Sequence, residues 1–293
     1  MKKVILGTDW WTDCDDAVAL RVISKFVKAG KAELIGIGIN ACMEYSAASV
    51  MGFLKAEELN GIPLGIDLTA VNFGGTPRYQ KNLAEKYCPA VKNEDVPDAV
   101  RLYRRLLAES NEKVEILEIG FLQVFVGVLK SGADDISEKT GLELVRDKVS
   151  KVWVMAGKWD ADGEKEHNFC LNTRTRAAGK EFCELCPVPV TFLGWEIGFD
   201  VITGDKLDQN DHLYRVMFDH GSKNGRSSWD PMLVLMALVG DEREAGYGTV
   251  TGIASVDAET GENYFEKRPD GKHKYVVKLY ENDYYKNKIN EIL

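Results

Sequence analysis

Short runs of apolar and β-branched residues alternate along the chain with longer segments in which apolar residues recur every three to four positions. The short runs predict strands over residues 4–7, 32–39, 114–119, 151–155 and 188–193, with later strands over 249–256 and 274–279. The longer segments predict helices over residues 15–28, 46–59, 98–110, 173–185, 228–239 and 281–292. This alternation is typical of parallel βαβ units. We therefore expect a single α/β domain over residues 1–293, with a Rossmann-like core in which helices cover both sides of a mostly parallel central sheet.

Composition places the chain among ordinary globular proteins, with 45% hydrophobic and 28% charged residues. The 37 basic and 46 acidic side chains give a net charge of −9, which argues against nucleic acid or an anionic membrane as a partner. No signal-peptide pattern is visible, and no apolar run reaches the roughly 20 residues of a membrane span. We expect a cytoplasmic protein that acts on a small molecule.

Cysteine and histidine spacing gives no sign of a zinc or disulfide framework. Six cysteines are scattered over the chain, which predicts reduced thiols. Cys183 and Cys186 are the one suggestive pair, and we interpret them as two positions on one helix face. The histidines show no spacing for metal ligands, and we expect all four at the surface: His167, His212, His220 and His273.

Candidate chemistry is concentrated where the first predicted strand meets the first predicted helix. Four aspartates, Asp9, Asp13, Asp15 and Asp16, lie within eight residues there. Ligands of open parallel sheets bind beyond the carboxyl ends of the strands. The longest irregular stretches, residues 72–87 and 158–168, are long enough to be active-site loops beside this position.

The clustered aspartates have two interpretations. Helix capping by Asp13 or Asp15, with Asp16 in the first turn, would explain one or two of them. Converging carboxylates repel one another unless a cation lies between them, and calcium takes six to eight oxygen ligands of this kind. We favour metal binding, although the spacing is not that of an EF-hand.

The acid-rich segment, residues 7–20, resembles the inosine-uridine-preferring nucleoside hydrolase family, in the branch with the spaced pattern D-T-D-x-G-x-D-x-D-D-A-x-A-L. Further segments are similar to family motifs and follow in the family's order. They are residues 154–157 (V-M-A-G), 166–168 (E-H-N), 192–198 (F-L-G-W-E-I-G) and 229–231 (W-D-P). The resemblance implies the nucleoside hydrolase fold and a homodimer or homotetramer.

It also implies an activity, the Ca²⁺-dependent hydrolysis of the N-glycosidic bond of ribonucleosides to ribose and free base. By this resemblance the calcium ligands are Asp9, Asp16, the backbone carbonyl of Gln123, and Asp230. Asp9 would also be the general base that takes a proton from the attacking water. The ribose hydroxyls would be held by Asp15, Glu166 and Asn168. Because Glu166 and Asn168 are two residues apart in an extended segment, His167 is expected to point the other way.

Structural interpretations of the same residues, without a functional role, stay open. Asp230 precedes Pro231 and an apolar run, which is also typical of an N-cap followed by proline. Glu166 and Asn168 lie in a polar stretch that could be exposed to solvent. Whether Asp13 contacts the metal is not decided by the sequence.

Four departures from the family pattern bear on activity. Gly7 replaces the first aspartate, Trp11 replaces a glycine, Ala156 replaces the first glycine of V-M-G-G, and residues 121–124 replace P-L-T-N. A shorter register of the acidic motif would put Trp11 at the base position and leave no base. We prefer the longer register because it accounts for Asp13 as well as Asp15 and Asp16.

Aromatic residues suggest a preference for purines. Trp229 precedes the late aspartate, where inosine-uridine enzymes often have a histidine, and this resembles the purine-specific branch. A large π-face suits stacking on a purine base. Trp10, Trp11 and Phe121 could join Trp229 around the base or be core aromatics, whereas Trp153 is expected in the core.

Three other functions compete with hydrolysis. A catalytically weak or redirected nucleoside- or ribose-binding relative is suggested by Gly7 and the altered residues 121–124. A haloacid-dehalogenase-like phosphatase fits poorly because Trp11 stands where its D-x-D-x-T pattern needs an aspartate. A structural calcium module would show no change of melting temperature with nucleosides.

Overall fold

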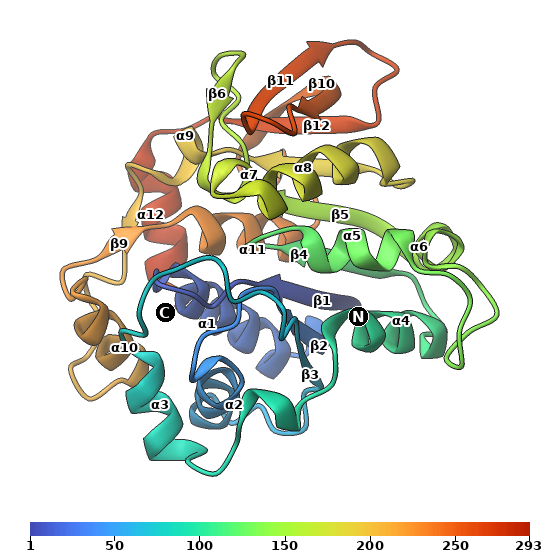
Figure 1. Cartoon of the computed structure of the whole chain (residues 1–293). Helices are drawn as coiled ribbons and strands as arrows, with labels where there is room; N and C mark the ends of the chain where they lie inside the picture. Colours follow the sequence, from blue (N-terminus) through green and yellow to red (C-terminus); the bar gives the residue numbers. More distant parts are fainter.

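The computed structural model describes all residues 1–293, and ten strands form one central sheet (Figure 1). Their order across the sheet is β3 (Leu64–Ile66), β2 (Ala32–Ile39), β1 (Lys2–Thr8), β4 (Val114–Glu118), β5 (Val149–Met155), β7 (Val190–Leu193), β12 (His273–Lys278), β10 (Tyr247–Val256), β11 (Glu262–Lys267) and β6 (Glu164–Lys165). Neighbours from β3 to β12 pair in parallel. The last three pairings are antiparallel. The predicted mostly parallel sheet is confirmed.

Helices cover both faces of the sheet (Figure 1). One layer comprises α1 (Asp15–Lys28), α2 (Ser46–Ala56), α3 (Gln80–Tyr87), α10 (His212–His220), α11 (Trp229–Val239) and α12 (Asn282–Asn290). The other comprises α4 (Ala99–Glu109), α5 (Gln123–Lys130), α6 (Gly141–Lys148) and α8 (Thr173–Leu185). The expectation of an α/β fold with helices on both sides is therefore confirmed.

Smaller elements lie in the connections between the sheet and the helices. Two four-residue helices, α7 (His167–Cys170) and α9 (Trp195–Gly198), follow β6 and β7. A separate ribbon pairs β8 (Ile202–Thr203) with β9 (Arg226–Ser227), and Asn93–Asp95 form a 3₁₀ turn. None of the helices combines the length and apolar character needed to cross a membrane.

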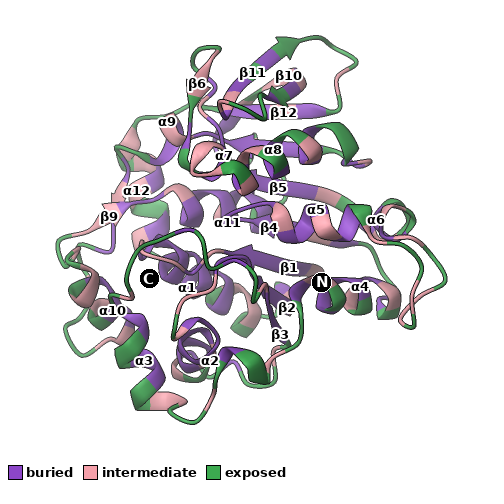
Figure 2. Ribbon diagram, in the orientation of Figure 1, coloured by how far each residue is buried: buried purple, intermediate pink, exposed green.

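The alternation of side chains along β1 builds the two cores. Val4 and Leu6 pack among the helices of the first layer, whereas Ile5 packs against the second. This is the two-residue period of a strand that is buried on both faces. Figure 2 shows the central strands buried along most of their length, whereas β11 near the edge of the sheet, the outer surfaces of the helices and the loops carry exposed residues.

Several boundaries differ from the predictions. The helix predicted over residues 46–59 ends at Ala56, because Glu58 adopts a positive φ of 58° that a helix cannot continue through. The stretches predicted as irregular, 72–87 and 158–168, contain α3 and β6. Helices α5 and α6 have eight residues each, too few for a strong periodic signal, and were not predicted.

All six cysteines are free, as expected for reduced thiols. Cys183 lies in α8 and Cys186 directly after its last residue, and both thiols are buried. His273 contradicts the expectation that the histidines lie at the surface. It is fully buried in β12, where its Nδ1 accepts a hydrogen bond from the Ala254 amide at 2.9 Å.

Candidate active site

A cavity of about 270 Å³ lies at the carboxyl ends of the central strands. Asp9 follows β1, Ile119 follows β4, Met155 ends β5 and Trp195 follows β7, and all four line the cavity. This is the edge at which open parallel sheets bind ligands. Six acidic side chains line the same cavity: Asp9, Asp13, Asp15, Asp16, Glu166 and Asp230.

Three of these acids form a tight group, which we call the acidic floor: Asp15, Asp16 and Asp230. One carboxylate oxygen of each lies within 4.8 Å of the others, and all three residues are buried. They belong to the first turns of α1 and α11, so the positive ends of both helix dipoles face them. Asp230 is not the N-cap of its helix, because Ser228 holds that position.

No lysine, arginine or histidine forms an ion pair with the acidic floor, although the charge of Arg226 lowers the pKa of Asp15 a little. Burial and the neighbouring Asp13 and Asp16 carboxylates raise the pKa of Asp15 well above its ordinary value. The pKa of Asp230 is also raised well above its ordinary value, mainly by burial and then by the charges of Asp15 and Asp16. Burial raises the pKa of Asp16 to about 6, and hydrogen bonds from Thr8 Oγ1 and the Trp10 amide hold it from rising further.

Asp9 lines the cavity beside the acidic floor but lies outside the tight group. Its Oδ1 accepts the Trp11 amide at 3.2 Å, and Oδ2 has no protein partner. Burial, then Asp16 and Asp15, raises the pKa of Asp9 well above its ordinary value. A Cβ on Gly120 would lie 2.8 Å from Asp9 Cβ and 2.9 Å from Asn40 Oδ1, so the glycine permits this close approach.

The donor set fits a hard cation such as Ca²⁺. Asp9 and the three floor residues supply only oxygen atoms, and their repulsion is relieved when a cation lies among them. Asn40, not found by sequence reasoning, has a buried amide nitrogen without a partner, which is a hydrogen-bond donor and not a metal ligand. Gln123 begins α5 and is not among the lining residues, and its Nε2 donates to the Asn40 carbonyl. Its expected carbonyl ligation stays a prediction.

Trp10 is a core aromatic that shapes the loop before α1. Its ring is 1% exposed and does not line the cavity, and its Nε1 donates to Ser49 Oγ at 2.9 Å. Its φ of 43° is left-handed, a conformation that costs a non-glycine residue about 1–2 kcal/mol. The Gln80 side chain donates to the carbonyls of Trp10 and Trp11, which helps to hold the strained turn between Asp9 and α1.

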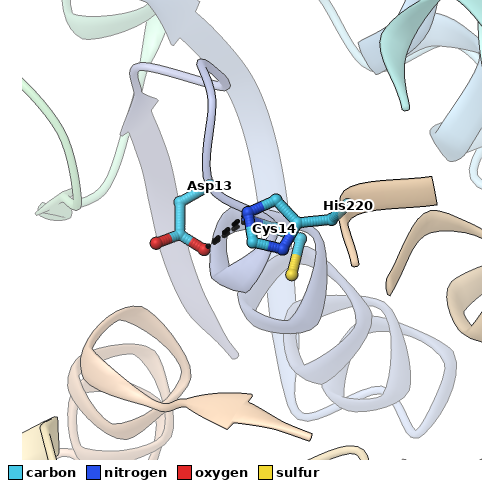
Figure 3. Close-up of side chains that lie close together, drawn as sticks. All are labelled: Asp13, Cys14 and His220. Atoms are coloured by element: carbon cyan, nitrogen blue, oxygen red, sulfur yellow. Dashed lines mark hydrogen bonds and ion pairs between the residues drawn. The ribbon is translucent and has the colours of Figure 1, made fainter. Parts of the chain in front are cut away.

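Asp13 points to a different set of partners (Figure 3). Arg226 Nε donates to its Oδ1 at 2.9 Å, and His220 Nε2 lies 3.6 Å from the same oxygen. Burial alone would raise the pKa of Asp13, but the hydrogen bonds and charge of Arg226 hold it below its ordinary value. Asp13 and His220 also lie close to the Cys14 thiol. Because Arg226 already balances Asp13, we assign no metal to this trio.

Glu166 and Asn168 are buried, not solvent-exposed. The Glu166 carboxylate accepts the Gly157 amide at 2.8 Å and the Asn168 amide at 2.9 Å, while Asn168 Nδ2 donates to the Met155 carbonyl at 2.9 Å. Burial raises the pKa of Glu166 to about 7. His167 is exposed between these two buried neighbours, and it also lines the cavity. Helix α7 begins at His167.

Gly7 stands where the family pattern has its first aspartate, and the neighbouring strand places an acid beside it. Gly7 in β1 pairs with Glu118 in β4, and a Cβ on Gly7 would overlap the Glu118 carboxylate. Glu118 Oε1 accepts the Tyr103 hydroxyl at 3.0 Å, and Oε2 is buried without a partner. Burial raises the pKa of Glu118 to about 8. A buried carboxyl therefore occupies the space beside Gly7, supplied by another strand.

Four aromatic residues also line the cavity, and we call them the aromatic wall: Trp11, His167, Trp195 and Trp229. Trp229 Nε1 donates to the Trp195 carbonyl at 2.7 Å, and the two rings are stacked with centroids 6.4 Å apart. Trp11 stacks on His167 at 5.6 Å. Phe121 and Trp153 are fully buried and outside the cavity, so both are core aromatics.

Comparisons with known proteins agree with this fold. No family model and no curated protein sequence matches the chain. Among solved structures, it is similar to the inosine-uridine preferring nucleoside hydrolase from Bacillus anthracis, with 14% identity over 100% of both chains and a TM-score of 0.69. The purine-preferring ribonucleoside hydrolase from Gardnerella vaginalis matches with 16% identity over 99% of this chain and 98% of that chain, and a TM-score of 0.72.

A third structure is the type III effector protein XopQ complexed with adenosine diphosphate ribose. It matches with 16% identity over 99% of this chain and 93% of that chain, and a TM-score of 0.69. These matches span nearly the whole length of each protein at low identity. The sheet, its helical layers and the cavity at the strand ends therefore lead to one conclusion, that this chain has the nucleoside hydrolase fold.

Proposed function

We propose that this protein hydrolyses the N-glycosidic bond of ribonucleosides in a Ca²⁺-dependent reaction, with a preference for purine bases. The observation that carries the proposal is the set of four aspartates, Asp9 and the three buried residues of the acidic floor, which share one cavity with an aromatic wall and form no ion pair with a cationic side chain. The fold likeness to a purine-preferring ribonucleoside hydrolase supports the same substrate class.

When bound, Ca²⁺ would lower the pKa of a coordinated water and offer positions for ribose hydroxyls. The single ion would be held by Asp9, Asp16 and Asp230, with Gln123 contributing its carbonyl oxygen. Asp9 Oδ2 is free to take a proton from the attacking water, because only Oδ1 is engaged by the protein. The water oxygen then bonds to C1′ while the C1′–N bond breaks and its electron pair passes to the base.

The remaining side chains would bind and orient the ribose. Asp15, Glu166 and Asn168 would hold its hydroxyls, and their carboxylates favour the positive charge that develops at C1′ in an oxocarbenium-like transition state. Glu166 and Asn168 are fixed by three hydrogen bonds to the backbone or to each other. Little free energy is therefore needed to reorient these side chains during the reaction. Trp229 and Trp195 would contact the base.

A nucleoside- or ribose-binding relative without turnover is the second candidate. It is favoured by the position of Gln123 outside the cavity lining, which weakens the expected ligand set. This candidate predicts that inosine raises the melting temperature while no ribose is released.

The test is reducing-sugar release from inosine, guanosine, adenosine, uridine and cytidine, with and without a calcium chelator. We expect purine nucleosides to be hydrolysed fastest, and both the chelator and Asp9→Ala to abolish turnover. Asp208→Ala, an exposed acid outside the cavity, is the matched control and should leave the rate unchanged. No turnover of any nucleoside by the calcium-loaded protein would contradict the proposal, and faster turnover of uridine than of inosine would contradict the purine preference.

A further inference from the structure

The cavity contains one fixed positive charge. Arg226, the first residue of β9, is the only lysine or arginine among the lining residues. The other basic residue there is His167, whose pKa is lowered by burial. Arg226 balances Asp13, and it also lies against the ring of Trp229, which would contact the base.

The guanidinium of Arg226 is held rigidly by one of its two hydrogen-bonding edges. Nε donates to Asp13 Oδ1 at 2.9 Å and Nη2 donates to Asp13 Oδ2, so the Nε/Nη2 edge is fully used. Asp13 is itself oriented by the Cys14 amide at 2.7 Å. Arg226 Cζ lies 5.3 Å from the centroid of the Trp229 ring, within the range of a cation–π contact.

The other edge of the guanidinium is free. Nη1 makes no hydrogen bond with the protein, and Nη2 keeps one N–H beyond those that face Asp13. The side chain is 34% exposed and lines the cavity. Arg226 thus offers two parallel donors, fixed in direction, beside the aromatic wall.

Two parallel donors match two adjacent acceptors. Hypoxanthine and guanine present N7 and O6 side by side, the pair that arginine recognises with both end nitrogens, whereas adenine has N7 beside an amino donor. Uracil has an N–H between its two carbonyls. We propose that the free edge of Arg226 selects 6-oxopurine ribonucleosides over adenosine in this cavity, an inference that rests on the proposed nucleoside hydrolysis.

The same contact would assist departure of the base. As the C1′–N9 bond breaks, its electron pair passes to the purine and negative charge spreads to N7 and O6. Arg226 donates at those two atoms, so its hydrogen bonds strengthen in the transition state. The departed base then takes up a proton from solvent.

The experiment measures kcat/KM for inosine, guanosine, adenosine and inosine 5′-monophosphate with the calcium-loaded protein. The wild type should prefer inosine and guanosine to adenosine. Arg226→Lys keeps the positive charge but loses the two parallel N–H donors, and Arg226→Gln removes both the charge and this pair of donors. Both variants should lower the inosine-to-adenosine ratio by about 10- to 100-fold. Arg215→Gln is a matched control, because Arg215 also lies 5.3 Å from an aromatic ring and pairs with an aspartate, but outside the cavity.

The possible failures are distinguishable. Turnover with equal kcat/KM for inosine and adenosine, or a ratio unchanged in Arg226→Lys, overturns the role of Arg226 and leaves the hydrolase proposal intact. An Arg226-dependent preference for inosine 5′-monophosphate over inosine would assign the guanidinium to a phosphate and overturns the base contact. If no nucleoside is hydrolysed, the proposed function fails. In that case tryptophan fluorescence still tests base recognition by Arg226. Quenching by inosine but not by adenosine, with the difference lost in Arg226→Gln, would support this recognition. Equal quenching by the two nucleosides would overturn it.

Discussion

Asp13 and Asp16 lie three residues apart and line the same cavity, yet their surroundings are opposite. Asp13 faces Arg226 and His220, and despite its burial its pKa is lowered. Asp16 is buried with Asp15 and Asp230, and its pKa is raised to about 6. The charge of Asp13 is therefore balanced within the protein, whereas the carboxylates of the acidic floor have no ion-pair partner and would be relieved by a cation. Under the proposed function, the pair of Asp13 and Arg226 belongs to the part of the cavity that would position the base, and the acidic floor to the part that would hold metal and ribose.

The largest expected effect on activity comes from removing one charge of the acidic floor. Asp16→Asn removes a floor charge with little change of shape, and we expect kcat/KM for inosine to fall about 1000-fold or more, with weaker Ca²⁺ binding. The matched substitution Asp13→Asn leaves the floor intact and should cost about tenfold at most. Steady-state rates at saturating Ca²⁺ test both, and equal losses in the two variants would show that the distinction is wrong.

The next effect concerns pH and Glu118, the buried acid beside Gly7. Because burial raises its pKa from 4.5 to about 8, the folded state binds its proton more tightly than the unfolded state does. Its contribution to stability is present at low pH and is lost as the pH rises from about 4.5 through 8. Relative to Glu118→Gln, the wild type should lose several kcal/mol of unfolding free energy between pH 5 and pH 9.

Urea unfolding of both proteins at the two pH values measures this difference. The comparison with Glu118→Gln cancels the other titrating groups, including the buried His273, whose pKa is lowered to about 4. A pH-independent difference between the two proteins would mean that Glu118 titrates normally.

A smaller effect is expected from restoring an acid at position 7. Gly7→Asp forces a side chain into the space of the Glu118 carboxylate, and such overpacking costs about 1–3 kcal/mol. Adding Glu118→Gly vacates that space, so the double variant should recover stability. Denaturant unfolding of the four proteins gives the coupling energy, and additive losses would contradict the shared space.

The smallest effect tests a supporting contact of the acidic floor. Thr8 Oγ1 donates to Asp16, and Thr8→Val removes this donor without changing the size of the side chain. We expect Ca²⁺ affinity to fall about tenfold, as for other residues that orient metal ligands. Thr8→Ser keeps the hydroxyl and should bind as the wild type does. Unchanged affinity in Thr8→Val would show that Asp16 is positioned without it.

The sequence was sufficient for the parallel sheet and for the acids, because both leave local signals. Asp15 and Asp16 follow a strand and open a helix, and Trp229 and Asp230 open another. The order of the family motifs along the chain then predicted that segments more than two hundred residues apart belong to one site. The fold and the presence of these acids at the strand ends could therefore be anticipated from the chain alone. The grouping of Asp15 with Asp16 and Asp230 was not anticipated, because Asp15 was assigned to the ribose and Asp9 to the metal.

The residues that sequence reasoning missed depend on contacts between distant segments. Arg226 gives no motif, and its position beside Asp13 arises from the ribbon formed by β8 and β9. Glu118 is related to Gly7 only through the register of two neighbouring strands.

The central claim is that the acidic floor with Asp9 is a cation site whose protons are displaced by metal. It is tested most directly by calorimetric titration of Ca²⁺ into the chelator-treated protein at pH 6, in two buffers of different ionisation enthalpy. We predict one Ca²⁺ per chain with release of protons to the buffer, since Asp16 has a pKa of about 6 and its neighbours lie higher than their ordinary values. In Asp16→Asn both the affinity and the proton release should fall. A folded wild type that binds no Ca²⁺, or an Asp16→Asn variant that binds it equally well, would contradict the account.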